Sequence, residues 1–174
     1  MLMFGISGIV LNHRHWYGNV NVSRNCLPET FRFERWNNGL LRGTLAAGDS
    51  VLVYGAGGVF ATDSTAKSFR DFSAGMPEGA DARNVRAVVK TPSGMQFALS
   101  PFNVYRLRHG RWSEVSAPFG SGERGTDMTV KGDTLVVRSR SKVYTAVPPY
   151  THFGEHELKA PEGYDGKVSL FRTV

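Results

Sequence analysis

The pattern of apolar and polar residues divides the middle of the chain into short strands separated by turns. Within residues 51–77, an apolar run, VLVYG, precedes a glycine-rich turn, a second run, GGVFAT, a polar turn and a third run, SFRDFS. Short β-branched and aromatic runs bounded by Gly, Asp and Ser are typical of antiparallel strands. This stretch therefore predicts a small β-meander.

The same order of runs and turns recurs twice downstream. The second unit consists of MQFALS, NVYRL and RWSEVS, and the third of TLVVRS, KVYTAV and GEHELK. A further strand is predicted before each unit, at residues 40–45, 85–90 and 128–130. The aromatic residue of each middle run is Phe60, Tyr105 or Tyr144, which gives spacings of 45 and 39 residues.

Repeats of about 40 to 50 residues with several strands each are typical of β-propeller blades. We therefore expect an all-β fold of repeated antiparallel meanders, a small or incomplete propeller. The unit resembles the blades of two-component-regulator and sialidase-repeat propellers. Within it, residues 62–69 (TDSTAKSF) resemble a degenerate Asp-box turn, with Ser64 in place of the Asp and Ala66 in place of the Gly. The resemblance implies a structural turn and no catalysis.

The glycines of the first turn are similar to a dinucleotide-binding loop, but the match is incomplete. Gly55, Gly57 and Gly58 are present, whereas Phe60 stands where the last glycine of such a loop belongs. The following residues lack the 3.6-residue periodicity of the helix that would hold a pyrophosphate. We expect a turn between antiparallel strands here and no dinucleotide site.

Composition allows one domain with a sizeable core, because the chain has 174 residues, of which 41% are hydrophobic and 21% charged. The net charge of +6 permits acidic partners, but the basic residues are scattered. Their densest run, residues 138–142, alternates like the outer face of a strand, so no nucleic-acid partner is predicted. The single cysteine, Cys26, excludes an intramolecular disulfide and a CxxC metal site.

The first eleven residues, MLMFGISGIVL, carry no charge. A membrane-spanning helix needs about 20 apolar residues, and a signal peptide would carry a basic residue before its apolar run. Residues 1–12 are therefore either the end of a transmembrane helix or a first buried strand. The spacing of Gly5 and Gly8 suits helix packing, and Trp16 and Tyr17 suit a membrane interface.

The segment FGISGIVLNHRH resembles the helix end of PepSY-associated transmembrane proteins, and the C-terminal LFRTV resembles the start of their next helix. The resemblance implies a bacterial inner-membrane protein, with residues 13–174 forming one domain between two helices and facing the periplasm. The flanking helices would attach the domain to the membrane. Some members of this family are thought to carry haem on membrane histidines, which makes His13 the candidate haem or iron ligand.

Residues 31–36 (FRFERW) alternate between apolar and polar positions, which predicts a half-buried strand. The sequence Asn-Asn-Gly at residues 37–39 then suits a hairpin turn. This strand could pair with the C-terminal run KVSLFRTV and so complete a further unit.

The remaining histidines and the carboxylates form no recognisable constellation. His152 and His156 are four apart, but Gly154 and the preceding Pro148-Pro149 argue against the helix that a zinc HxxxH motif needs. We expect surface histidines and no metal site. Carboxylates considered for hydrolysis all lie in or beside predicted turns: Asp63, Asp71, Glu114, Asp127 and Asp133. Tryptophans that could line a sugar or peptide groove are Trp16, Trp36 and Trp112, although packing is the commoner role of such residues.

No catalytic residues and no cofactor are therefore assigned. The sequence favours a non-enzymatic, extracytoplasmic module that binds a small ligand or a protein partner, within a membrane protein linked to iron or haem handling. Two alternatives stay open: a propeller-type hydrolase acting on glycans, and a soluble stand-alone binding protein.

Overall fold

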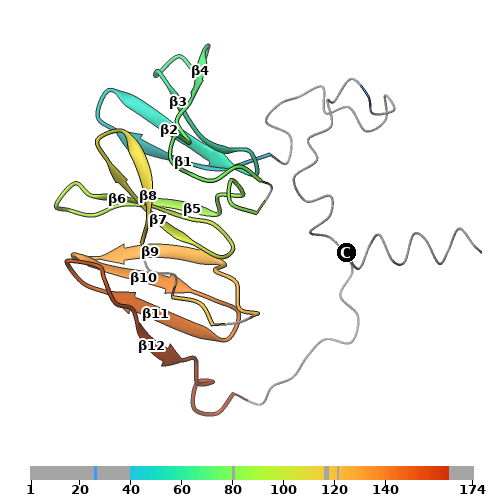
Figure 1. Ribbon diagram of the computed structural model, residues 1–174. Helices are drawn as coiled ribbons and strands as arrows, with labels where there is room; N and C mark the ends of the chain where they lie inside the picture. Colours follow the sequence, from blue (N-terminus) through green and yellow to red (C-terminus); the bar gives the residue numbers. More distant parts are fainter. Residues whose placement is uncertain (1–25, 27–39, 80, 116–117, 121, 165–174) are drawn as a thin grey trace, which may run out of the picture.

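The computed structural model describes residue 26, residues 40–79, 81–115, 118–120 and 122–164. These residues form three antiparallel four-stranded sheets, which lie one after another along a stack (Figure 1). Each sheet corresponds to one repeat unit, and we call the sheets blades 1 to 3. The predicted all-β fold of repeated meanders is confirmed.

Every blade is a simple meander in which neighbours in the chain are neighbours in the sheet. Blade 1 consists of β1 (Leu41–Ala47), β2 (Ser50–Gly55), β3 (Gly58–Thr62) and β4 (Phe69–Asp71). Blade 2 consists of β5 (Ala87–Lys90), β6 (Gln96–Leu99), β7 (Val104–Arg108) and β8 (Arg111–Val115). Blade 3 consists of β9 (Asp127–Lys131), β10 (Thr134–Arg138), β11 (Lys142–Ala146) and β12 (Gly154–Glu157).

The strands lie where the repeat pattern predicts them, with small shifts at their ends. The strand predicted from residue 85 begins instead at Ala87. Val85 is still fully buried, but its N–H donates to the carbonyl oxygen of Gly55 in blade 1 at 2.9 Å rather than to a strand of its own blade. The first strand of blade 2 is thus preceded by a residue that ties it to blade 1.

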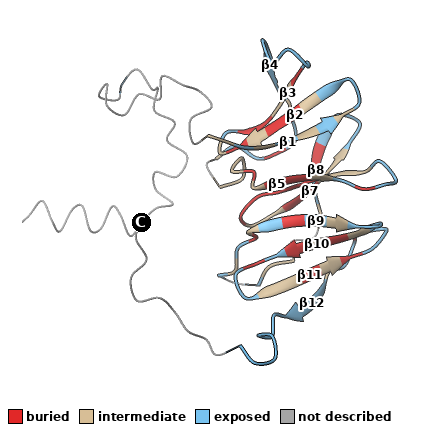
Figure 2. Cartoon of the chain, turned by 180° about the vertical axis from the view of Figure 1, so that it is seen from behind, coloured by how far each residue is buried: buried red, intermediate tan, exposed pale blue. Residues whose placement is uncertain are grey.

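Blade 2 is the centre of the stack because apolar side chains cover both of its faces. Alternate residues of a strand point to opposite faces, so Ala98 and Tyr105 pack toward blade 1 and Phe97 and Val104 toward blade 3. Buried residues accordingly concentrate in blade 2 and on the blade faces that meet it (Figure 2).

The first strands of the three blades, β1, β5 and β9, also contact one another in succession. In a propeller, the first strand of each blade lies nearest the axis and touches the first strands of its neighbours. The arrangement is therefore propeller-like, and the blades within the described residues do not close into a ring.

Several sequence predictions concern residues outside the described part of the chain. These are the helix or strand at residues 1–12, the ligand candidate His13, the strand at residues 31–36 and the C-terminal run. Within the described residues, no helix is long and apolar enough to cross a membrane. Cys26 is described and exposed.

The glycine-rich turn joins two antiparallel strands, as predicted. Gly55 pairs with Gly58, and the turn lies between them. A side chain at Gly55 would collide with the backbone of the neighbouring strand, since its Cβ would lie 1.7 Å from the carbonyl oxygen of Leu40. Glycine is thus required here by a close backbone approach.

The Asp-box-like turn lies between β3 and β4. Asp63 organises it, because one of its carboxylate oxygens accepts hydrogen bonds from the N–H of Thr65 at 2.9 Å and from its hydroxyl at 2.7 Å. In the Asp-box resemblance, Ser64 stands in the Asp position, whereas the carboxylate that organises the turn belongs to Asp63, one residue earlier. Ala66, in the Gly position, has a φ of +50°, a left-handed conformation that favours glycine.

Replacing Ala66 with glycine is therefore expected to stabilise the protein by about 1 kcal/mol, because the backbone strain of a left-handed alanine is relieved. Urea denaturation measures the change. Ala46→Gly in β1 is the matched control, since Ala46 is also exposed and lies in a regular strand. That control is expected to lose stability, and a similar loss in Ala66→Gly would contradict the description of the turn.

Candidate functional site

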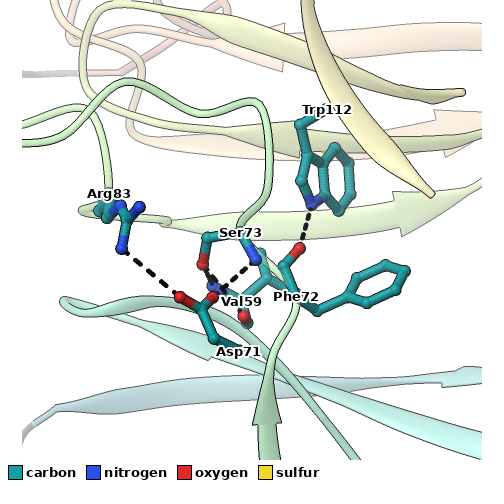
Figure 3. A network of polar contacts seen from close by, with 6 residues as sticks. All are labelled: Val59, Asp71, Phe72, Ser73, Arg83 and Trp112. Atoms are coloured by element: carbon teal, nitrogen blue, oxygen red, sulfur yellow. Dashed lines mark hydrogen bonds and ion pairs between the residues drawn. The ribbon is translucent and has the colours of Figure 1, made fainter.

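The junction between blades 1 and 2 is held by a polar network around Trp112 and Ser73 (Figure 3). The indole N–H of Trp112 donates to the carbonyl oxygen of Phe72 at 2.7 Å. The backbone N–H of Trp112 donates to the carbonyl oxygen of Ala74 at 2.8 Å. The Trp112 side chain is only 2% exposed. Trp112 is thus a packing residue between blades and lines no open groove.

Ser73 and Asp71 complete this network on the side of blade 1. The buried hydroxyl of Ser73 accepts from the N–H of Val59 at 3.0 Å and donates to the Val59 carbonyl at 3.1 Å. Asp71 accepts from the N–H of Ser73 at 2.7 Å and lies 3.5 Å from Arg83. Although partial burial opposes the shift, the hydrogen bonds from Ser73 and the charge of Arg83 lower the pKa of Asp71. The network is structural, and within it the buried Nε of Arg83 has no hydrogen-bond partner among the described residues.

Two further buried serines escaped the sequence analysis. Ser100 and Ser139 are fully buried, and each hydroxyl both donates to and accepts from the backbone three residues further on, which closes the turn between the second and third strands of its blade. Both lie five residues before the repeated aromatic residue, Tyr105 or Tyr144. That shared spacing was visible in the sequence and could have identified them.

A cleft lies between blades 2 and 3, and we call it the inter-blade cleft. Its volume is about 290 Å³. One wall is formed by β7 and β8 of blade 2, and the other by the segment that leaves β11 of blade 3. The lining residues are Arg106, Arg108, Ser113, Glu114, Val115, Pro149, Tyr150 and Thr151.

Tyr150 anchors the blade 3 wall of the cleft in the core. Tyr150 is 1% exposed, and its ring centre lies 4.8 Å from that of Phe97 in blade 2. Its hydroxyl donates to the carbonyl oxygen of Asp133 at 2.8 Å. Burial raises the pKa of Tyr150, the charge of Asp133 raises it further, and the charge of Arg106 opposes this rise. Tyr150 is thus an uncharged structural residue in the wall of the cleft, and the guanidinium of Arg106 lies near it.

Among the carboxylates considered for hydrolysis, only Glu114 lines the cleft. It lies within β8 and not in a turn, and its carboxylate accepts from the side-chain amide of Asn103 at 2.6 Å. Asp63 and Asp133 do lie in turns, and Asp71 and Asp127 are strand-end residues. The paired carboxylates of a glycosidase must face one cleft, and this cleft contains one.

None of the described histidines is among the residues that line the cleft. His109 occupies the turn between β7 and β8 with a φ of +49°, His152 is in an exposed loop, and His156 is on β12, where its ring contacts the Thr145 hydroxyl at 3.0 Å. As the sequence predicts, His152 and His156 do not lie on a helix, because His152 is in a loop and His156 is on β12. No group of three or more metal-binding side chains occurs within the described residues.

No family model matches the chain, and no curated protein matches it. The PepSY-associated resemblance of the two ends is therefore not supported by a family match. Among solved structures, the chain is similar to the extracellular domain of BT4673 from B. thetaiotaomicron, a protein described as a hybrid two component system, with 11% identity and a TM-score of 0.58. The match covers 68% of this chain and 17% of the other.

A second structure of an extracellular domain of BT4673, there described as a one component system, gives 9% identity and a TM-score of 0.55 over the same shares of the two chains. The chain thus spans about a sixth of the length of these proteins. At such low identity, the similarity establishes the fold alone. The fold and the inter-blade cleft define the chain as a propeller-like β-repeat domain.

Proposed function

We propose that this domain is a non-enzymatic binding module that works outside the cytoplasm and takes a small ligand in the inter-blade cleft. The observation that carries the proposal is the cleft itself, which lies between two packed blades and presents several polar side chains to a ligand. Binding sites of this kind commonly lie between structural units and combine an apolar body with a few polar groups. The likeness to extracellular domains is in keeping with an extracytoplasmic setting.

The proposal includes attachment to a bacterial inner membrane through flanking helices, with the domain on the periplasmic side. This part rests on the resemblance of the segment at residues 4–15 to PepSY-associated proteins. The same segment contains His13, the candidate iron or haem ligand. Both features concern residues outside the described part of the chain.

Glycan hydrolysis is less well supported by the geometry. A retaining or inverting hydrolase needs one carboxyl group as acid and a second as nucleophile or base. The inter-blade cleft offers only Glu114, which is engaged with Asn103. A binding role needs no such pair.

A ligand screen by thermal unfolding tests the proposed function. We expect at least one small metabolite to raise the Tm of the wild-type protein, because a ligand that binds only the folded state stabilises it. Ser113→Trp, which places a bulky ring in the cleft, should abolish this rise. Ser64→Trp in the exposed β3–β4 turn is the matched control and should retain it.

Two results would overturn the proposal. One is a screen in which no compound stabilises the wild-type protein. The other is stabilisation that persists unchanged in a folded Ser113→Trp variant, since the ligand would then bind elsewhere.

A further inference from the structure

The cleft presents two arginines from a single strand. Arg106 and Arg108 are two apart in β7, so both side chains point to the same face of blade 2, which is the face turned toward blade 3. Ser113 pairs with Arg106 across the β7–β8 ladder and also lines the cleft, and Arg111 pairs with Arg108. Positive charge is thus concentrated along one wall.

This positive charge is only partly offset by acidic side chains in the described part of the chain. Neither Arg106 nor Arg108 forms an ion pair with any of the described residues. Two acidic side chains lie in the neighbourhood, and each accepts from a neutral donor: Glu114 accepts from Asn103, and Asp133 accepts from the Ser93 hydroxyl at 2.9 Å. A neutral donor leaves the charge of a carboxylate in place, so Glu114 offsets one of the two arginine charges among the residues that line the cleft. The wall therefore carries excess positive charge.

Arg106 also has an unused hydrogen-bond donor. Its Nε atom is buried and has no hydrogen-bond partner. One of its terminal nitrogens donates to the sulfur of Met95 at 3.0 Å, and a thioether is a weak acceptor. A buried charged donor without a good acceptor is costly. The Nε atoms of Arg83 and Arg86 are also buried without a partner, but of these three arginines only Arg106 lines the cleft, where a ligand could supply an acceptor to its guanidinium.

We propose that the inter-blade cleft binds the oxyanion group of a small ligand, a carboxylate or a tetrahedral sulfate or phosphate, between Arg106 and Arg108. This inference rests on the proposed binding function of the cleft. The planar fork of a guanidinium matches the two oxygens of such groups, which makes arginine the preferred residue for their bidentate recognition. The volume of about 290 Å³ suits a small molecule.

Calorimetric titration at constant ionic strength tests this inference, with sodium sulfate, sodium phosphate and sodium succinate as probes. We expect the wild-type protein to bind at least one of them. Arg108→Gln should weaken binding about tenfold or more, because a charge-assisted hydrogen bond is lost. Arg140→Gln is the matched control, since Arg140 is an exposed turn residue and its replacement changes the net charge equally.

Comparison of the probes identifies the chemistry of the ligand, because succinate alone would indicate a carboxylate and sulfate or phosphate a tetrahedral group. Arg106→Gln should abolish binding, provided that circular dichroism shows the β-fold intact. Arg108 is exposed, so its variant keeps the test valid even if the Arg106 variant does not fold.

The inference is overturned if Arg108→Gln and Arg140→Gln bind the anions equally well, or if none of the anions binds. In either case, a neutral compound whose stabilising effect Ser113→Trp abolishes would preserve the proposed binding function. Absence of any ligand sensitive to Ser113→Trp would overturn both the inference and the proposed function.

Discussion

Trp112→Ala is expected to lower the free energy of unfolding by about 3–5 kcal/mol, the usual cost of truncating a buried tryptophan. Trp112 is 2% exposed and belongs to the apolar cluster between blades 1 and 2. Its removal leaves a cavity at the junction and leaves the carbonyl oxygen of Phe72 without its indole partner. Urea denaturation followed by circular dichroism measures the loss.

Trp112→Phe separates the two contributions, because it retains much of the apolar packing and removes the hydrogen bond to Phe72. We expect a smaller loss of about 1–3 kcal/mol. Leu158→Ala provides the surface control, since Leu158 is 54% exposed. If Trp112→Ala lowered the free energy of unfolding no more than Leu158→Ala does, the result would contradict the packing of Trp112 between blades 1 and 2.

Gly75→Ala is expected to lower the free energy of unfolding by at least about 3 kcal/mol through strain and collision together. Gly75 has a φ of +95°, and a Cβ there would lie 2.1 Å from the carbonyl oxygen of Trp112. That oxygen belongs to the backbone of β8 and cannot move without disturbing blade 2. The change should therefore separate the segment that follows β4 in blade 1 from β8 in blade 2.

Gly94→Ala is the control for backbone strain alone. Gly94 has a similar φ of +86°, but nothing lies within 4 Å of the position that a Cβ would occupy. We expect it to cost about 1 kcal/mol. Equal losses in the two variants would mean that blade 1 does not approach Trp112 as closely as the structure shows.

The repeat pattern predicted the fold well because each blade is built from contacts that are local in sequence. The strand alternation and the turn residues of each blade occur within a single unit. Each unit also contains one of the aromatic residues Phe60, Tyr105 and Tyr144, which are 45 and 39 residues apart. A meander pairs only successive strands, so its topology follows directly from the order of the runs. The same local information explains why the glycine turn at Gly55 was correctly interpreted.

The inter-blade cleft could not be predicted in this way. Arg106 and Tyr150 are far apart in sequence and meet only because blades 2 and 3 pack together around Phe97. In the sequence, Arg106 and Arg108 are two of the scattered basic residues, and no pattern marks them as a site. The buried role of Trp112 likewise depends on contacts between blades.

Mapping of amide chemical shifts on addition of the tightest ligand from the screen tests the central claim, that the inter-blade cleft is the binding site. Perturbed amides should concentrate in β7, β8 and residues 149–151, which form the two walls of the cleft. Shifts confined to blade 1, or distributed evenly over the three blades, would contradict the claim.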